Sequence, residues 1–231
     1  MTVHDISKTE RIEMYLKAVY TVAQATPPVT ISKVADYMGV SAPSSHEMLK
    51  RLETQGLLKS TAEQGYRLTS RGMETATRVV RRLRLAERLL TDVLRLDLAL
   101  VHGEACKLEH VISPEVEARL SEVLGHPATC PHGLPIPGDA APAPEMLPTL
   151  DTLAVWDRAT VASIPEEDEG VVRHLVEVGV LPGATVLVRE VGPLKGPITV
   201  QIADQIRAIG REVAGRVRVR PTTLPSPERF L

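Results

Sequence analysis

Apolar residues near the start of the chain recur at the three- and four-residue spacing of helices buried on one face. Residues 9–24 predict one such helix, which ends before Pro27-Pro28. Residues 32–38 and 41–55 predict two shorter helices, separated by a turn that contains Gly39. Two short helices around a glycine-containing turn are typical of a helix-turn-helix.

The pattern changes directly after these helices. Residues 57–60 and 66–69 read as two short strands, and the polar residues between them predict a turn. A hairpin in this position is the wing of a winged helix-turn-helix. A generic helical pair in a bundle is the alternative, and the hairpin and the local positive charge favour the winged form. We therefore predict a winged helix-turn-helix DNA-binding domain over residues 1–72.

Leucine-rich amphipathic helices fill the middle of the chain. Residues 70–94, 98–112 and 113–125 predict three helices. Leucine-rich helices of this kind often pack against a copy of themselves, so we expect a homodimer. We assign residues 73–126 to a helical dimerisation domain.

The last part of the chain combines a proline-rich segment with short strands. Prolines and little periodicity predict a linker over residues 127–150. A short helix is predicted near 170–178, and the predicted strands are 159–164, 185–191, 198–203 and 213–219. They predict a small β-barrel over residues 151–221, and residues 222–231 are predicted to be disordered. The fold is therefore mainly α with a small β part.

Composition excludes several classes of protein. Two cysteines are too few for a disulfide framework, and no apolar run near the length of a membrane span and no charged segment followed by an apolar one favours a membrane span or a signal peptide. We expect a cytoplasmic protein without a membrane partner. Residues 1–82 contain 12 Lys and Arg against 8 Asp and Glu, a net charge of +4, whereas the remaining residues contain 15 against 21, a net charge of −6. This sign is expected if the N-terminal part binds phosphates.

Potential metal ligands are concentrated in residues 102–110. A helix would place four of them on one face, because positions i, i+4, i+7 and i+8 point the same way: His102, Cys106, Glu109 and His110. Imidazole, thiolate and carboxylate together suit a divalent transition metal better than calcium or magnesium, which prefer oxygen alone. The alternative is that Cys106 is a small core residue and His110 a hydrogen-bonded helix histidine.

These features together resemble the diphtheria toxin repressor family of metal-dependent transcriptional repressors, over nearly the whole chain. The closest segments are Glu-Met-Tyr-Leu at 13–16, Ser-Ala-Pro at 41–43, Arg-Leu-Ala-Glu-Arg-Leu-Leu-Thr-Asp at 84–92, the ligand block at 101–113 and Gly-Leu-Pro-Ile-Pro-Gly at 133–138. The resemblance implies a winged helix-turn-helix, a helical dimerisation and metal-binding domain and a C-terminal SH3-like β-barrel.

The resemblance also implies ligand sets. A regulatory metal site would consist of Met14, Cys106, Glu109 and His110. A second, ancillary site would use Glu87 and His102, although Leu83 replaces a histidine that many members carry. The acidic run Glu166-Glu167-Asp168-Glu169 offers a further ligand from the barrel. Fe(II) is the first expectation for the metal and Mn(II) the second, since thioether and thiolate donors favour iron.

The predicted helix over residues 41–55 should lie in the major groove of DNA, with its first residues nearest the base edges. Lys50 is expected to contact phosphate. The candidates for contacts at base edges are Ser41, Pro43, Ser44, His46 and Glu47.

We therefore predict a metal-dependent repressor that binds double-stranded operator DNA as a dimer when loaded with Fe(II) or Mn(II), and that controls metal homeostasis genes. A winged-helix regulator of a small organic ligand, with the ligand stripe merely structural, is the alternative. A metalloenzyme is a third reading, but the sequence has no HExxH, P-loop or GxSxG motif, so we expect neither an enzyme nor a small-molecule substrate.

Overall fold

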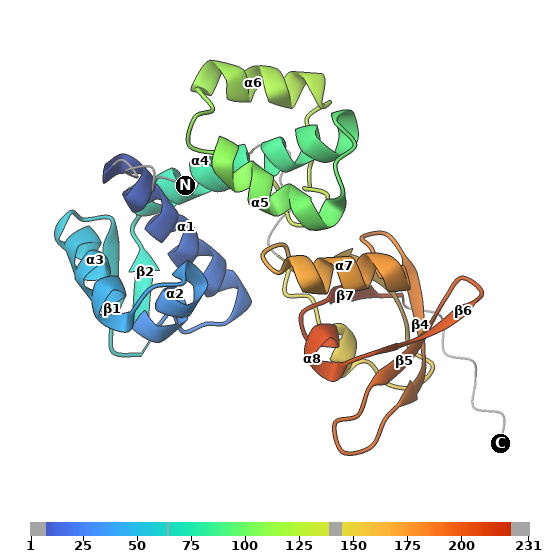
Figure 1. Cartoon of the computed structure of the whole chain (residues 1–231). Coiled ribbons are helices and arrows are strands. Elements are labelled where there is room, and N and C mark those ends of the chain that lie inside the picture. Colours follow the sequence, from blue (N-terminus) through green and yellow to red (C-terminus); the bar gives the residue numbers. More distant parts are fainter. Residues whose placement is uncertain (1–7, 64, 139–144, 223–231) are drawn as a thin grey trace. The chain divides into compact units, whose positions relative to one another are not determined.

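The N-terminal helices and a hairpin form one unit of the structure, and later helices with a five-stranded sheet form another (Figure 1). The computed structural model describes residues 8–63, 65–138 and 145–222. The first unit is Met1–Leu83 with Glu109–Ile112, and the second unit is Arg84–Leu108 with Ser113–Leu231. The predicted disordered tail, residues 222–231, lies outside the described residues apart from Thr222.

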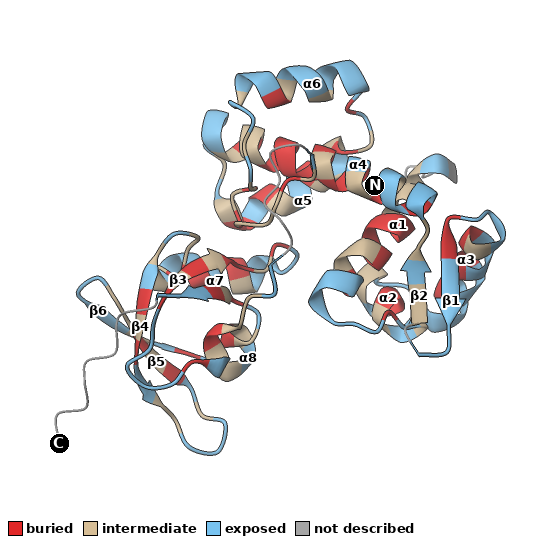
Figure 2. Ribbon diagram, turned by 180° about the vertical axis from the view of Figure 1, so that it is seen from behind, coloured by how far each residue is buried: buried red, intermediate tan, exposed pale blue. Residues whose placement is uncertain are grey.

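The first unit contains the predicted helix-turn-helix. Its helices are α1 (Lys8–Ala25), α2 (Ile31–Met38) and α3 (Ala42–Thr54). Gly39 ends α2 in the left-handed conformation with φ +64, and the hydroxyl of Ser41 accepts a hydrogen bond from Ser44 N at the start of α3. Helices α1 and α3 both have buried faces (Figure 2). The core of this unit includes their leucines Leu16, Leu49 and Leu52.

The predicted wing is an antiparallel hairpin of β1 (Leu58–Thr61) and β2 (Gly65–Leu68). The carboxylate of Glu53 on α3 accepts hydrogen bonds from Ser60 N at 2.9 Å and Ser60 Oγ at 2.6 Å. Gly65 has φ +64, and a Cβ added there would lie 2.0 Å from Val29 O. The wing is therefore tied to α3 on one side and to the segment before α2 on the other.

The three predicted helices of the middle region are present, with two differences. The first is α4 (Ser70–Arg88), which continues as a π-helical turn over Leu89–Val93. The second, α5 (Leu98–Leu108), ends before Glu109, so the predicted helix over 98–112 is too long. Only His102 and Cys106 of the predicted ligand stripe are therefore on the helix itself. The third is α6 (Pro114–Val123), which is exposed over most of its length (Figure 2).

Residues 127–138, predicted as the start of a linker, are folded into the second unit. Thr129 pairs with Pro135 in an isolated bridge, and Cys130, His132 and Ile136 are buried. A Cβ at Gly133 would lie 2.1 Å from Ala162 O, so the loop approaches the backbone of the sheet closely. The proline content indicated an extended segment, but these three side chains between the prolines are buried.

The C-terminal part is a small antiparallel sheet, with strands in the order β6-β5-β4-β3-β7. The strands are β3 (Arg158–Ser163), β4 (Thr185–Val191), β5 (Ile198–Ile202), β6 (Gln205–Ile209) and β7 (Arg218–Pro221), and the helical segments are η2 (Leu150–Thr152), α7 (Glu169–Val178) and α8 (Arg211–Ala214). The pattern missed β6, and the predicted strand over 213–219 is wrong because helix α8 and a turn precede β7. Helix α7 packs against α5, and Ala99 joins the core of the sheet.

We predict that Gly65→Ala destabilises the first unit by roughly 3 kcal/mol, because an alanine would combine a left-handed backbone with a collision at Val29. Thermal or urea unfolding measures the change. Gly103→Ala is the matched control, since Gly103 lies in α5 with nothing within 4 Å of an added Cβ. A Gly65→Ala protein as stable as the control would show that this contact does not constrain the wing.

Candidate metal centre and DNA-binding surface

Two of the predicted regulatory ligands meet in the first unit. Glu109 and His110 follow directly after α5, and His110 Nε2 lies 3.2 Å from Glu109 Oε1. His110 Nδ1 lies 2.8 Å from Glu13 Oε2, on helix α1. Contacts with Glu109 and then Glu13 raise the pKa of His110 to about 9. The two carboxylates therefore favour the protonated imidazole in the metal-free protein.

Glu13 is a residue of this site that the sequence analysis did not single out. In a neutral His110 the Nδ1–H would donate to Glu13, which fixes the tautomer and leaves Nε2 for another partner. Lys17, one helical turn further along α1, donates to Glu109 Oε1 at 2.5 Å. Glu109 is buried, and its Oε2 atom has no hydrogen-bond partner.

The other two predicted regulatory ligands, Met14 and Cys106, belong to different units. Met14 follows Glu13 on α1 and is half-buried in the first unit. Cys106 is half-buried on α5 in the second unit. Their roles as ligands beside Glu109 and His110 stay predictions.

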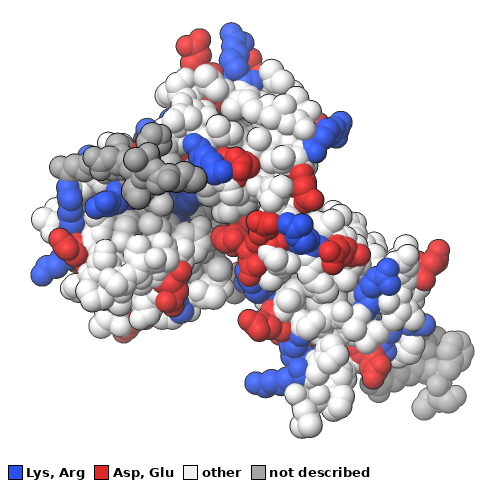
Figure 3. All heavy atoms as spheres, viewed as in Figure 1, with Lys and Arg blue, Asp and Glu red and all other residues white. Residues whose placement is uncertain are grey.

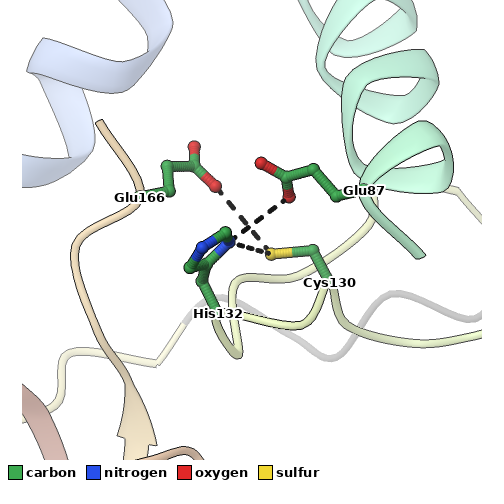
Figure 4. A group of neighbouring side chains, drawn as sticks. All are labelled: Glu87, Cys130, His132 and Glu166. Carbon is green, nitrogen blue, oxygen red and sulfur yellow. Dashed lines mark hydrogen bonds and ion pairs between the residues drawn. The ribbon is translucent and has the colours of Figure 1, made fainter. Parts of the chain in front are cut away.

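A second group of donors lies in the second unit and is fully buried (Figure 4). It consists of Glu87 on α4, Cys130 and His132 from the loop over 127–138, and Glu166 between β3 and α7. One ligand atom from each of the four lies within 4.8 Å of the others. We call these four residues the buried cluster. Oxygen, sulfur and nitrogen donors at this spacing fit a transition-metal ion.

Two side-chain atoms of the buried cluster lack a hydrogen-bond partner. Glu87 Oε2 and His132 Nε2 are both buried and have none, and Glu87 Oε2 lies 3.6 Å from His132 Nδ1. Cys130 Sγ donates to Glu166 Oε2 at 3.8 Å, a long contact even for sulfur. Buried polar atoms are normally paired, so the unpartnered atoms indicate that the cluster binds something further.

Charge in the buried cluster supports the same conclusion. Burial raises the pKa of Glu166, and burial followed by the charge of Glu87 raises the pKa of the Cys130 thiol well above its usual value. Burial also acts to raise the pKa of Glu87, but contacts with His102 and His132 outweigh it and lower that pKa to about 2. Burial thus disfavours the charged forms of Glu166 and Cys130, and a bound cation would favour them.

His102, a predicted ancillary ligand, contacts Glu87 but stands outside the buried cluster. His102 Nδ1 lies 2.9 Å from Glu87 Oε1, and Nε2 lies 3.5 Å from Cys106 Sγ. Burial lowers the pKa of His102, but contacts with Cys106 and Glu87 raise it to about 11. Both ring nitrogens are therefore engaged by other candidate ligands. Its role as a ligand remains a prediction.

Cys130 and His132 were not predicted as ligands. The sequence Cys130-Pro131-His132 places two donors close together, but the prolines around them are typical of a linker. Of the four acidic residues at 166–169, the structure buries Glu166 and leaves the other three exposed. Asp168 instead caps α7 and pairs with Arg216. Leu83, at the position of the missing histidine, is buried.

The surface of α3 fits the predicted DNA contacts. All six predicted residues are exposed, namely Ser41, Pro43, Ser44, His46, Glu47 and Lys50. The buried residues of the same helix face the core instead. On the face drawn in Figure 3, charged side chains lie scattered among uncharged ones over the N-terminal helices. The candidate DNA-binding surface is therefore characterised by exposed side chains at the start of α3 and not by a dense group of basic residues.

Comparison with known proteins places this arrangement in a family. Models of the iron dependent repressor match its N-terminal DNA binding domain to residues 8–66 and its metal binding and dimerisation domain to residues 69–138, and a FeoA domain matches residues 149–221. The iron-dependent repressor IdeR of Mycobacterium leprae is 34% identical over 221 residues, which cover 90% of this chain and 95% of the relative. The chain belongs to the iron-dependent repressor family.

Other relatives of the iron-dependent repressor family agree. The diphtheria toxin repressor of Corynebacterium diphtheriae is 40% identical over 126 residues, which cover 54% of this chain and 56% of that protein. The solved structure of a manganese-dependent transcriptional repressor in complex with manganese superposes with a TM-score of 0.84 at 30% identity. The superposition covers 91% of this chain and 100% of that chain.

Membership confirms the predicted fold class and the predicted function of a metal-dependent transcriptional repressor. The family consists of DNA-binding repressors and not enzymes, and it supports the metal-dependent reading over a regulator of organic ligands. Across the part of the chain that the structure describes, no helix combines the length and the apolar character needed to span a membrane.

Arg84 contacts Glu166 of the buried cluster, and we expect its removal to destabilise the protein. Its Nη2 atom lies 3.5 Å from Glu166 Oε1, and Nη1 donates to Pro135 O at 2.5 Å. We predict that Arg84→Met lowers the free energy of unfolding by about 3 kcal/mol in the presence of a chelator. The reason is that the buried carboxylate of Glu166 loses the guanidinium group with which it pairs.

Arg173→Met is the matched control, because Arg173 pairs with Glu169 on the exposed side of α7. Chemical unfolding of both variants gives the comparison, and the control should change by less than about 0.5 kcal/mol. Equal losses in the two variants would contradict the assigned importance of Arg84.

Proposed function

We propose that this chain binds operator DNA as a homodimer when Fe(II) or Mn(II) occupies two donor groups, and thereby represses genes of metal homeostasis. The observation that carries the proposal is the presence of two donor groups in a chain of the iron-dependent repressor family, one that contains the buried Glu109 and one that is fully buried, both with unpartnered carboxylate or imidazole atoms. Such a protein acts where its DNA is, in the cytoplasm.

The regulatory site consists of Met14, Cys106, Glu109 and His110. Support comes from the first unit, where Nε2 of His110 faces Glu109 and Nδ1 contacts Glu13. Glu13 acts as the orienting carboxylate behind the histidine ligand. The unpartnered Oε2 of Glu109 offers a second oxygen to the same ion.

The buried cluster belongs to the ancillary site, and it adds Cys130, His132 and Glu166 to the predicted pair of Glu87 and His102. A bound ion would place positive charge beside the carboxylates of Glu87 and Glu166. It would also stabilise the thiolate form of Cys130, which can then act as a ligand. His102 contacts Glu87 at the edge of the buried cluster. Because Glu166 precedes α7 and Glu87 lies on α4, occupancy of the cluster ties the sheet to the helices of the second unit.

Regulation of DNA binding follows from where the ligands lie along the chain. Helix α1 carries Met14 and Glu13, and its buried face packs in the same core as α3. Ligation by Cys106 on α5 therefore restrains the unit that contains the recognition helix. A restraint of this kind favours the binding-competent state and raises operator affinity.

Fe(II) is the first choice of metal and Mn(II) the second. A sulfur-containing donor set favours iron, and relatives by sequence are named as iron-dependent. A manganese-dependent repressor is nevertheless among the most similar solved structures, so the cellular metal supply decides between the two.

The dimer interface lies on the helices of the second unit. Several large apolar side chains are exposed there, namely Val93, Leu94, Leu100, Val116 and Val123. Exposed apolar groups of this size on neighbouring helices are typical of a surface covered by another protein. A second copy of the chain is the partner that the proposal assigns to it.

The test measures binding to a duplex selected from random sequences in the presence of Mn(II), over a range of free Fe(II) and Mn(II) concentrations without oxygen. We expect chelation to abolish specific binding by the natural chain. Glu109→Gln should require at least roughly 10-fold more metal, because a charged ligand is lost. Glu104→Gln is the control, since Glu104 pairs with Lys107 on the exposed side of α5. Binding that is indifferent to chelation would contradict the proposal.

Lys50 separates phosphate contact from base recognition. We expect Lys50→Met to weaken binding to selected and to unrelated duplexes by the same factor, because a phosphate contact carries no sequence information. The slope of log K against log salt should fall in magnitude by about one. His46→Ala should instead change the preferred sequence. A Lys50→Met protein with unchanged affinity would remove Lys50 from the interface.

A further inference from the structure

Lys17 is a buried cation at the carboxylate of a proposed metal ligand. It lies on α1, is 7% exposed, and donates from Nζ to Glu109 Oε1 at 2.5 Å. Glu109 is 1% exposed. Both members of this pair are therefore removed from water, in contrast to the exposed lysine and glutamate pairs on the surface of the chain.

Lys17 is a charged residue between buried apolar residues of α1. Leu16, Ala18 and Val19 are all fully buried, so Lys17 lies in an apolar stretch of α1. Lysine is almost never buried without a partner, and burying an ion pair often stabilises a protein no more than apolar packing would. An apolar side chain would fill the same space without a desolvation cost. The charge itself is the property that distinguishes lysine here.

Lys17 and His110 contact the same oxygen. His110 Nε2 lies 3.2 Å from Glu109 Oε1, the atom to which Lys17 donates. An ion bound by this oxygen and by His110 Nε2 would lie within about 2.2 Å of each donor. An ammonium group still hydrogen-bonded to the same oxygen would then face a divalent cation at close range. The two positive charges would repel each other strongly in a buried site at this separation, so metal binding favours departure of the ammonium group.

We propose that Lys17 is a tethered competitor of the metal. In the metal-free protein its ammonium group neutralises Glu109, and it leaves that carboxylate when an ion binds. Lys17 thereby raises the metal concentration at which the repressor becomes active, while it protects the metal-free fold from an unpaired buried carboxylate. This inference rests on the proposed function, because it takes Glu109 as a ligand.

Two other roles for Lys17 give different results. A purely structural anchor between α1 and Glu109 would stabilise the metal-free and metal-bound proteins equally and leave metal affinity unchanged. A residue that orients Glu109 for the ion would strengthen metal binding, so that its removal would weaken it. Metal affinity and stability measured together distinguish these roles from competition.

The experiment compares Lys17→Met and Lys17→Gln in the full chain, with Cys130→Ser as a common background that removes a ligand of the buried cluster. Free Mn(II) is measured by electron paramagnetic resonance, and thermal unfolding is recorded without metal and at saturating Mn(II). Lys107→Met is the matched control, because Lys107 pairs with Glu104 on the exposed side of α5.

Competition predicts that Lys17→Met binds Mn(II) roughly 10- to 100-fold more tightly, since a charge-assisted hydrogen bond no longer has to be exchanged for the ion. Its unfolding midpoint should fall by roughly 5 °C without metal and change little at saturation. Lys17→Gln should lie between Lys17→Met and the parent chain. Lys107→Met should match the parent chain in both measurements.

Unchanged or weaker Mn(II) binding by Lys17→Met would overturn the inference, as would failure of both variants to fold at saturating Mn(II). Folding of the variants only when Mn(II) is present would support it, because the ion then replaces the missing cation. Glu109→Gln separates this outcome from failure of the proposed function. If Glu109→Gln leaves Mn(II) affinity unchanged, the ligand assignment is wrong, whatever the Lys17 variants show.

Discussion

Buried negative charge is the constraint on which the candidate centres depend. Among the described residues, the buried acidic side chains are Glu87, Glu109 and Glu166, and all three belong to these centres. Each is matched by a basic group from a distant part of the sequence, since Glu109 contacts Lys17, Glu166 contacts Arg84 and Glu87 contacts His102. A carboxylate taken out of water needs such a partner, so these contacts determine how the segments pack.

The fold supplies these partners in a specific way. Helix α4 carries both Arg84 and Glu87, one turn apart, and the loop over 127–138 lies against them, with Arg88 donating to Thr129 O at 2.7 Å. Glu166 enters from the chain between β3 and α7, while Asp168, two residues later, caps α7. A helix, a loop and a strand end therefore converge through polar contacts, whereas apolar packing of α5 on α7 brings the elements together.

Sequence patterns were sufficient for elements with a clear period and insufficient for contacts that depend on tertiary structure. The helix-turn-helix, the wing and most strands of the sheet were predictable, because caps, glycine turns and alternation are local signals. The end of α5 at Leu108 was not predictable, because the helical spacing of the donors up to His110 indicated a longer helix. The burial of Cys130 and His132 was hidden by prolines, and only tertiary contacts distinguish Glu166 from the acidic residues that follow it.

The two cysteines differ in their exposure to reactive oxygen species. Cys130 is buried, and its raised pKa keeps the sulfur protonated and weakly nucleophilic. Cys106 is only half-buried. Oxidants therefore reach the sulfur of Cys106 on α5 more readily than the sulfur of Cys130, which lies in the interior of the second unit.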